Sequence, residues 1–246
     1  MIMIKKALHI ALLGYGKMGR AVEKMALSRQ HVIKCRIDSE ADWLSSQDIL
    51  KQCDIAIEFS LPETAPGNIR RCLELGIPVV SGTTGWDHEL ESLVRLCEEK
   101  NGCLLHASNF SIGVNFFFEM NRQLARMLSG MKGYSPRIVE SHHKHKLDAP
   151  SGTAISLARD IIEHREELNK WAREGKEKEA GSLPIKSYRM EDVIGTHVVV
   201  YDSEIDSIEI KHTSHDRRGF AEGALLAAEW VHDKQGVFTM KDFLNI

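Results

Sequence analysis

The sequence lacks three features that would narrow its class at once: a hydrophobic run of membrane-spanning length, an excess of one charge, and a Cys-x-x-Cys pair. The apolar run near the N-terminus covers about eight residues and leads into a glycine motif, so we expect neither a signal peptide nor a membrane span. The net charge of -3 argues against nucleic acid or an anionic membrane as a main partner. Five cysteines without close pairing are typical of reduced thiols in a cytoplasmic protein.

What is present from residue 8 to about 107 is an alternation of short apolar runs with helical patterns. Strands are expected in "HIALLG", "HVIKCRID", "DIAIEFS", "IPVVSG" and "GCLLHAS", and helices over 18–28, 64–75 and 87–100. Strands that alternate with helices in this way form parallel sheets with helices on both faces. The first part of the chain is therefore predicted to be an α/β domain built on a parallel sheet.

The pattern changes after residue 111. We expect an apolar helix over 112–128, a strand ending near Ser141, a helix after the Ser-Gly-Thr turn, and an antiparallel hairpin of strands 195–202 and 205–212. The stretch 163–184 is almost entirely charged, which favours a solvated helix and loop. The final segment, from Phe220, returns to helical periodicity. A two-domain protein whose C-terminus folds back on the first domain fits these changes, although the pattern alone does not require it.

A Gly-x-Gly-x-x-Gly motif, "GYGKMG", follows the first predicted strand and begins the first predicted helix. It places Gly14 at a tight turn, Gly16 where a backbone approaches a pyrophosphate, and Gly19 where the helix packs closely on the strand. The helix N-terminus adds free N–H groups and a positive dipole for phosphates. The motif favours a dinucleotide site over a turn that merely permits packing. Its predicted cofactor contacts are Gly14, Tyr15, Gly16, Lys17, Met18 and Gly19.

The second predicted strand ends at Asp38, about 20 residues after the glycine motif, where an acid can accept hydrogen bonds from the adenosine ribose hydroxyls. This position favours NADH. Lys34 and Arg36 lie in the same strand, and Arg36 could lean towards a 2′-phosphate, so the use of NADPH stays open. The alternative interpretation of Asp38 is an ordinary cap or turn residue.

Two polar turns follow later strands of the same predicted sheet, at the edge where open α/β sheets bind ligands. The first is "SGTTGW" and the second is "HASNFS". Backbone and hydroxyl groups in both could contact the nicotinamide ribose or carboxamide, although capped turns explain the pattern equally well. The candidate residues are Gly82, Thr83, Thr84, Ala107, Ser108, Asn109 and Phe110.

The stretch "SHHKHKLDAPSGTA" concentrates histidines and lysines just before a predicted helix. A metal site is one interpretation of His142, His143 and His145. However, adjacent side chains of an extended segment point to opposite faces, and the two lysines would repel a cation. A solvated basic loop is another alternative. A nucleophile at Ser151 or Lys146 is a third, but the serine has no Gly-x-Ser-x-Gly elbow.

The interpretation we prefer is an anion site that also delivers protons. Ser151 is a good N-cap, and Gly152 and Thr153 then offer backbone N–H groups in the first helical turn. Nearby histidine and lysine add charge-assisted hydrogen bonds and, near neutral pH, a general acid. Such a pocket suits a small dianion that is protonated during its reaction. The helix is expected to turn residues 155, 157, 158, 161 and 162 inward.

Together these segments resemble the 4-hydroxy-tetrahydrodipicolinate reductase (dihydrodipicolinate reductase) family. The similarity covers nearly the whole chain, through "GYGKMG", "SGTTGW", "SNFSIGVN", "ESHHKHKLDAPSGTA", "YRMEDVIGTHVVVY" and "FAEGALLAAEW". The histidine-rich run is highly specific to this family, whereas the glycine motif alone is not.

The resemblance implies an enzyme of diaminopimelate and lysine biosynthesis that reduces a cyclic imine dicarboxylate with NADH or NADPH. His142 and Lys146 match the family's proton donors, and His143, Gly152 and Thr153 match its substrate-binding positions. The resemblance also implies a Rossmann-type domain of residues 1–111 and 218–246. Residues 112–217 would then form an α+β substrate and tetramerisation domain with an open mixed sheet, and domain closure over the substrate would exclude water.

The sequence departs from the family pattern at two positions of the cofactor site, and two other functions remain as alternatives. Some members have a longer glycine turn, and an arginine often follows the strand-end acid where this chain has Ser39, so we favour NADH with NADPH tolerated. A nicotinamide-binding regulatory protein without turnover is the main alternative, but the intact His142 and Lys146 argue against it. A metal-dependent hydrolase would require bound metal, and we expect none.

Overall fold

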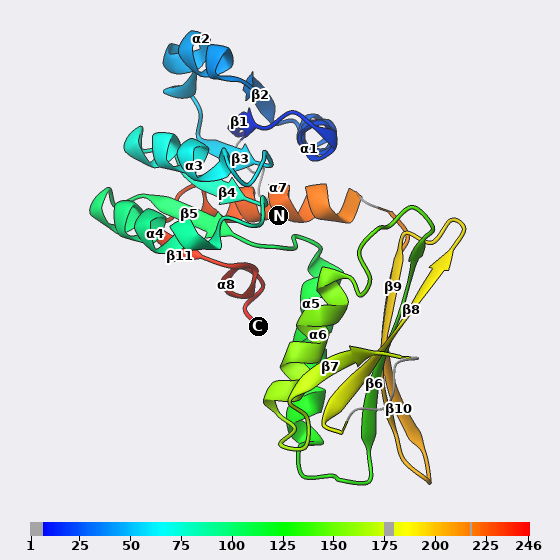
Figure 1. The fold of residues 1–246 in the computed structure, drawn as a ribbon. Coiled ribbons are helices and arrows are strands. Elements are labelled where there is room, and N and C mark those ends of the chain that lie inside the picture. The colour runs from blue at the N-terminus through cyan, green and yellow to red at the C-terminus, as the bar shows by residue number, and fades with distance from the viewer. Residues whose placement is uncertain (1–6, 175–179, 217) are drawn as a thin grey trace, which may run out of the picture. The chain divides into compact units, whose positions relative to one another are not determined.

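A computed structural model describes residues 7–174, 180–216 and 218–246. The chain divides into two compact units, the first made of Met1–Ile112 with Arg218–Ile246 and the second of Gly113–Arg217. Figure 1 shows the elements of both units. None of the helices among the described residues is both long and apolar enough to cross a membrane.

The first unit is built on a parallel sheet of six strands in the order β11-β5-β4-β3-β1-β2. Its central strands are almost completely buried because they are covered on both faces, which explains their continuous apolar runs. The predicted parallel sheet is confirmed, but the sixth strand, β11, lies in the segment that we expected to be helical. The strands are β1 (His9–Leu13), β2 (Val32–Ile37), β3 (Ile55–Glu58), β4 (Val79–Ser81), β5 (Cys103–His106) and β11 (Gly236–Phe238).

Helices cover the two faces of this sheet with separate apolar cores. Side chains of α1, α7 and α8 form one core, and side chains of α2, α3 and α4 form the other. The helix α2 was not predicted, because its buried residues do not form a clear stripe, but Ser39 caps it by accepting a hydrogen bond from the Asp42 backbone. The helices are α1 (Lys17–Ser28), α2 (Glu40–Leu50), α3 (Ala65–Glu74), the short 3-10 turn η1 (Asp87–Glu89), α4 (Leu90–Glu99), α7 (Arg218–Val231) and α8 (Met240–Leu244).

A buried polar cluster fastens the helix α7 to the N-terminal part of the first unit. The Leu8 backbone donates to His31 Nδ1 over 3.0 Å, so the opposite ring nitrogen carries the proton that is shared with Glu229 Oε1 at 3.0 Å. Arg29 donates to both oxygens of the same carboxylate, over 2.8 and 3.0 Å. Because every partner is satisfied, this charge is tolerated in a side chain that is 3% exposed.

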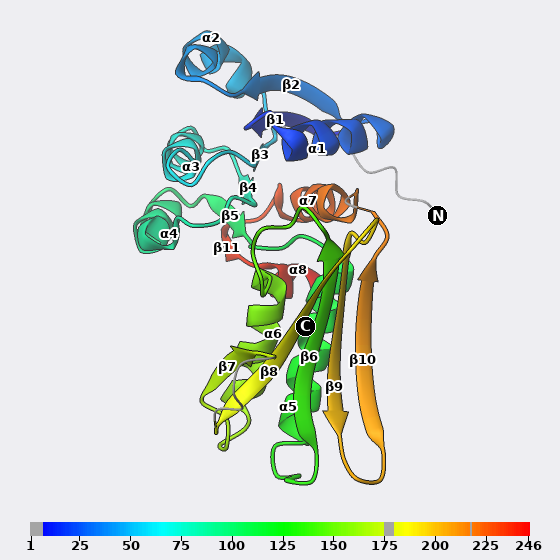
Figure 2. The same cartoon turned by 45° about the vertical axis from the view of Figure 1, so that its right-hand side comes forward.

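The second unit has a mixed sheet in the order β10-β9-β6-β8-β7, with α5 and α6 packed on one face. Figure 2 shows these two helices behind the long strands. The hairpin of β9 and β10 is antiparallel, as predicted. The elements are α5 (Ile112–Met127), β6 (Ser135–His143), α6 (Gly152–Glu163), β7 (Lys170–Arg173), β8 (Ser182–Met190), β9 (Gly195–Asp202) and β10 (Ser207–Ser214).

One expectation for this unit was wrong, and another was confirmed only in part. The charged stretch 163–184 contains β7 and the start of β8 rather than only helix and loop. These strands form because β8 pairs with β6 and β7 pairs with β8. Part of that stretch, residues 175–179, lies outside the described residues. In α6 the predicted inward residues Leu157, Ala158 and Ile161 are buried together with Ala154, and Ile162 packs against the same core, whereas Ile155 is only half-buried.

Candidate active site

The glycine motif forms the turn between β1 and α1. Gly14 has a φ of +87°, and a Cβ at this position would lie 2.1 Å from the Phe59 carbonyl oxygen, so no other residue fits without a backbone shift. A Cβ at Gly19 would lie 2.2 Å from the Gly14 oxygen, which explains the close packing of helix on strand. No atom lies within 4 Å of a Cβ at Gly16, the N-cap of α1, so the backbone there is open to a ligand.

A cavity of about 520 Å³ adjoins this turn at the carboxyl ends of the strands. It lies beside β1, between β2 and β3, where the strand order reverses and open α/β sheets bind nucleotides. Gly14, Gly16 and Asp38 all line it. The residues therefore fit a nucleotide, because the open backbone of Gly16 is suited to a phosphate and the carboxylate of Asp38 to a ribose hydroxyl. The Tyr15 backbone donates to Asp38 Oδ1 over 2.8 Å, which fixes the acid at the turn.

The arginine that could have read a 2′-phosphate is engaged elsewhere. Arg36 donates to both oxygens of Glu23, and its guanidinium lies 5.5 Å from the centre of the Tyr15 ring. The hydrogen bonds to Glu23 raise the pKa of Arg36 and lower that of the carboxyl, so both stay charged and paired. Lys17 is exposed at the first position of α1 and Met18 packs against the apolar core below it.

The "SGTTGW" turn is organised by a completely buried acid that sequence reasoning missed. Glu58, the last residue of β3, accepts hydrogen bonds from the Thr83 hydroxyl over 2.8 Å and from the Ser60 backbone over 2.8 Å. Gly82 is required because a Cβ there would lie 2.0 Å from the Phe59 ring. The neighbouring Thr84 is exposed. This network fixes the turn after β4 against the turn after β3.

The residues after β5 have different environments. The Ala107 backbone donates to Ser81 over 3.1 Å, and Asn109 accepts from the Ser111 backbone over 2.9 Å. Ser108 is exposed, whereas Phe110 is buried and stacks edge-on against Phe59 at 5.8 Å. The Phe110 side chain is therefore a core residue, and only its backbone neighbours remain available to a cofactor.

In the second unit, strand alternation builds a polar site within an otherwise apolar face. Glu140 and His142 lie two residues apart in β6, on the face that packs against the helices. Strand register then places His197 of β9 and Ser187 of β8 directly beside Glu140, and Arg189 beside His142. These cross-strand partners come from positions about 50 residues away, which explains why the local motif did not reveal them.

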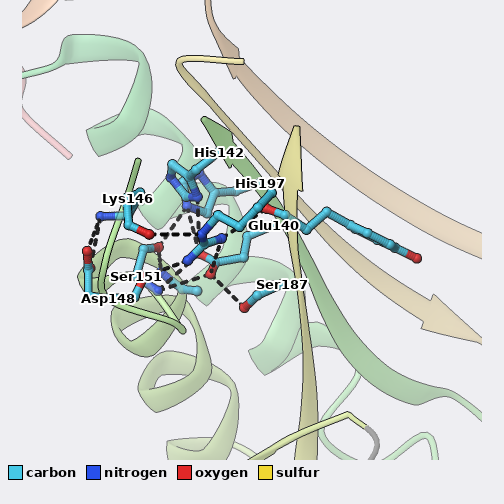
Figure 3. Close-up of polar contacts among 10 residues, drawn as sticks. Glu140, His142, Lys146, Asp148, Ser151, Ser187 and His197 are labelled. Carbon is cyan, nitrogen blue, oxygen red and sulfur yellow. Dashed lines mark hydrogen bonds and ion pairs between the residues drawn. The ribbon is translucent and has the colours of Figure 1, made fainter. Parts of the chain in front are cut away.

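Glu140 is the centre of this site (Figure 3). Its two oxygens accept from the Ser151 backbone over 3.1 Å each, and Oε1 also accepts from the Ser187 hydroxyl over 2.7 Å. The carboxylate is completely buried, which by itself opposes ionisation. The neighbouring His197 and the hydrogen bonds from Ser151 and Ser187 outweigh burial and lower the pKa of Glu140 to about 2. A stable negative charge is therefore present beneath the histidines.

His142 lies above that charge and is 7% exposed. Burial, then the neighbouring His197, Lys146 and Arg189, lower its pKa to about 4, and Glu140 opposes them. Its Nδ1 atom is 3.6 Å from Glu140 Oε2 and makes no hydrogen bond with the described residues. In the ligand-free protein the ring is therefore neutral near pH 7.

The loop after β6 presents Lys146. Its ammonium contacts both oxygens of Asp148, over 2.7 and 2.8 Å, and this pairing lowers the pKa of the carboxyl. Arg189 holds the loop by donating to the Lys146 carbonyl over 3.2 Å and to the Asp148 carbonyl over 2.5 Å. Lys146 is thus anchored through its backbone near the buried histidines, with its side chain 24% exposed.

The N-terminus of α6 borders the same site. Ser151 caps the helix by accepting from the Ala154 backbone over 3.2 Å, and its hydroxyl lies 3.1 Å from His197 Nε2. Gly152 is exposed, Thr153 is half-exposed, and no atom lies within 4 Å of a Cβ built at Gly152. The first N–H groups of a helix have no intrahelical partner. This helix end is therefore suited to an anion.

His143 is separated from His142 by the alternation of the strand. It lies on the opposite side of β6, where it lines a hollow of about 430 Å³ with Lys144 and His145. Lys144 pairs with Glu191 over 2.7 Å. The structure therefore brings together His142, the Lys146 loop and the α6 N-terminus, but it does not place His143 among them.

Glu140, His142 and His197 each offer an atom within 4.8 Å of the others, a spacing that could hold a metal ion. The set differs from the three neighbouring histidines considered from the sequence, of which it contains only His142. Two features of the site oppose a cation. Glu140 already accepts three hydrogen bonds, and the Arg189 guanidinium lies 3.8 Å from its Oε1 atom.

A parallel nucleotide-binding sheet in one unit and a basic histidine site in the other define a pyridine-nucleotide-dependent oxidoreductase. Comparison with known proteins identifies which one. Residues 8–110 match "Dihydrodipicolinate reductase, N-terminus", and residues 113–244 match "Dihydrodipicolinate reductase, C-terminus". The chain belongs to the dihydrodipicolinate reductase family, whose reductases act in diaminopimelate and lysine biosynthesis. The resemblance seen in the sequence is confirmed.

Individual relatives agree with this assignment. The chain is 46% identical over 238 residues to the 4-hydroxy-tetrahydrodipicolinate reductase of Christiangramia forsetii, covering 97% of this chain and 98% of that protein. It is 35% identical over 204 residues to the Neisseria gonorrhoeae enzyme of the same name, covering 80% and 75%. The dipicolinate-bound dihydrodipicolinate reductase from Paenisporosarcina sp. TG-14 has the same fold, with a TM-score of 0.76, 23% identity, and coverage of 95% of this chain and 98% of that chain.

Proposed function

We propose that this chain reduces 4-hydroxy-tetrahydrodipicolinate to tetrahydrodipicolinate with loss of water, and that His142 supplies the proton. The observation that carries the proposal is the buried imidazole of His142, which lies near a stable carboxylate and the loop that presents Lys146, close to an open helix N-terminus. The reaction takes up one hydride and one proton and releases one water. A positioned acid is needed because hydride addition leaves negative charge on the conjugated ring.

The proposed cofactor contacts are the residues of the first unit. The open N-terminus of α1 at Gly16 binds the pyrophosphate, and Asp38 binds the adenosine ribose. The turns at Gly82 to Thr84 and Ala107 to Phe110 contact the nicotinamide end through backbone and hydroxyl groups. When bound, the nicotinamide supplies the hydride.

The substrate end uses charge in two ways. Gly152 and Thr153 bind one carboxylate through backbone N–H groups at the start of α6, and Lys146 leaves Asp148 to bind the substrate or to give a second proton. The dianion also changes His142: negative charge beside the ring favours imidazolium, which a pKa of about 4 disfavours in the ligand-free protein. The family resemblance also assigns His143 to the substrate, but its side chain lines the hollow on the opposite side of β6, so we propose no carboxylate contact for it from this geometry.

NADH is the proposed preferred cofactor, with NADPH tolerated. Three acids line the cavity near the ribose position: Asp38, Glu40 and Glu63. Its one arginine, Arg71, is paired with both oxygens of Glu40 over 2.9 Å and stacks on Trp43. A 2′-phosphate would therefore meet carboxylates before a free cation, at a cost of roughly 1–3 kcal/mol for each close like-charge pair.

A homotetramer in the cytoplasm is the proposed state of the enzyme. Among the described residues no helix covers the second face of the five-stranded sheet, and Tyr188 and Met190, both about half exposed, lie on it. A sheet face of this kind is suited to pairing with another copy. Four of the five cysteines are buried free thiols, which fits a reducing compartment. Sedimentation equilibrium tests the assembly, and a monomer at micromolar concentration contradicts it.

The role of His142 is tested by His142→Gln, which keeps polarity but removes the titrating group. General acid catalysis typically contributes about 100- to 10,000-fold, so kcat should fall by that range with a modest change in substrate KM. His145→Gln is a matched control, since His145 is exposed on the other side of the loop. An unchanged kcat in His142→Gln would assign the proton to another group.

A further inference from the structure

Glu140 connects several elements of the second unit. It bonds the first turn of α6 through the Ser151 backbone, bonds β8 through Ser187, and lies beneath two histidines. Oε2 is 3.6 Å from His142 Nδ1 and 3.7 Å from His197 Nε2. These distances are about 0.4 to 0.5 Å beyond a normal hydrogen bond. One carboxylate thus connects the proton donor with the helix end proposed to bind substrate.

The unbonded ring nitrogen is the second observation. His142 Nδ1 is buried and makes no hydrogen bond to a described residue, although buried polar atoms almost always have a partner. Glu140 Oε2 lies 3.6 Å from this nitrogen. A small rotation of the ring or a small shift of the loop completes the bond. The carboxylate of Glu140 is therefore positioned to become the missing hydrogen-bond partner of His142 Nδ1.

We propose that Glu140 is a positioning residue of the reductase: it accepts Nδ1–H of His142, so that Nε2 is the atom that exchanges the proton with substrate. This inference rests on the proposed role of His142 as proton donor. A carboxylate that holds an imidazole in one tautomer and stabilises its charged form is a known catalytic device. Here the same carboxylate also holds the Ser151 backbone, so anion binding at the α6 N-terminus and alignment of the imidazole are linked.

The charges around the ring show why a carboxylate is needed. Arg189 of β8, Lys146 of the loop and, when protonated, His197 of β9 all disfavour a charged His142. Glu140 is the group acting on His142 that favours the imidazolium. Glutamine at this position would keep the size and one acceptor oxygen, but it would remove the charge.

The decisive variant is therefore Glu140→Gln, compared with Glu140→Asp and with Glu229→Gln as a matched control. Glu229 is also a buried acid bonded to a histidine, His31, but it lies in the other unit. We expect kcat to fall about 10- to 1,000-fold in Glu140→Gln, with partial recovery in Glu140→Asp. The limb of the kcat–pH profile that reports the acid should move to lower pH. Glu229→Gln should lose thermal stability without moving that limb.

Nitrogen NMR of histidine-labelled protein tests the contact without reference to turnover. In the wild-type protein near pH 7, His142 should be the tautomer protonated at Nδ1, and Glu140→Gln should shift it towards the Nε2-protonated form. A wild-type ring protonated at Nε2 overturns the inference even if His142→Gln proves that His142 is the acid. Conversely, the wild-type ring could be protonated at Nδ1 while His142→Gln keeps full activity. The contact with Glu140 would then exist but would have no catalytic role, which also overturns the inference.

A metal ion on the same three side chains would give a different result. Stoichiometric metal in purified protein, with loss of activity on chelation and recovery with Zn²⁺, would mean that Glu140 is a ligand and not a positioning residue. We expect chelation to leave kcat unchanged.

Discussion

Binding of the dianionic substrate should be accompanied by proton uptake at His142. In the ligand-free protein its pKa is lowered to about 4, mainly by burial and by neighbouring positive charge. A carboxylate bound at the α6 N-terminus or by Lys146 brings negative charge near the ring, which favours the protonated form. The pKa of His142 should therefore rise on binding, and the complex should hold a proton that the free protein lacks.

The size of the effect follows from Coulomb's law. A charge 4 to 6 Å away at an effective dielectric constant of 20 to 40 contributes roughly 1–4 kcal/mol. At about 1.4 kcal/mol per pH unit, the nearer carboxylate raises the pKa of His142 from about 4 to between about 5 and 7. At pH 6 the free ring is about 1% protonated, and the bound ring should be protonated to between about one tenth and nine tenths.

The assay is calorimetric titration with pyridine-2,6-dicarboxylate, a non-reacting planar dianion, in buffers of different ionisation enthalpy. The dependence of the observed enthalpy on the buffer gives the number of protons taken up. Because His143 and other histidines can also titrate, the relevant quantity is the difference between wild type and His142→Gln at pH 6. Equal uptake by the two proteins would refute the reasoning, since the proton would then be bound elsewhere.

Two further predictions concern the cofactor and stability. Asp38→Ala should lower kcat/KM for NADH more than for NADPH, because it removes both the ribose contact and the repulsion of a 2′-phosphate; an equal loss for both cofactors would contradict the assignment of Asp38. As pH falls from 6.5 to 4, the unfolded chain binds a proton at His142 that the folded protein does not bind, so the free energy of unfolding should fall by up to about 3 kcal/mol. Urea unfolding of His142→Gln should show a shallower loss over the same pH range, and parallel curves would contradict the buried neutral ring.

Local patterns predicted the nucleotide half of the molecule well. The alternation of strands and helices and the strand–glycine–helix order depend on nearby residues, and the parallel sheet followed from them. The helix α2 and the strand β11 could not be predicted from local patterns, because α2 has no clear apolar stripe and β11 is a strand of three residues added at the edge of the sheet. The strand β7 is charged and is held by its pairing with β8.

The candidate active site, too, could be predicted from the sequence only in part. His142, Lys146, Gly152 and Thr153 stand in one continuous motif, so residue type and spacing could suggest an anion site with proton donors, while the separate roles of His142 and Lys146 came from the family resemblance. The role of Glu140 depends on strand register, which sets it opposite His197 and beside Ser187. No local pattern contains that information. An acid two residues before a histidine at a strand end is the one signal that could have suggested it.

The measurement that tests the central claim most directly is oxidation of NADH by the purified chain in the presence of freshly formed 4-hydroxy-tetrahydrodipicolinate. The account predicts turnover that requires the cyclic substrate, that persists after chelation of metals, and that falls by at least about 100-fold in His142→Gln. A chain that binds NADH tightly but oxidises none of it when the substrate is added would contradict the account and would favour a nucleotide-binding regulator of the same fold.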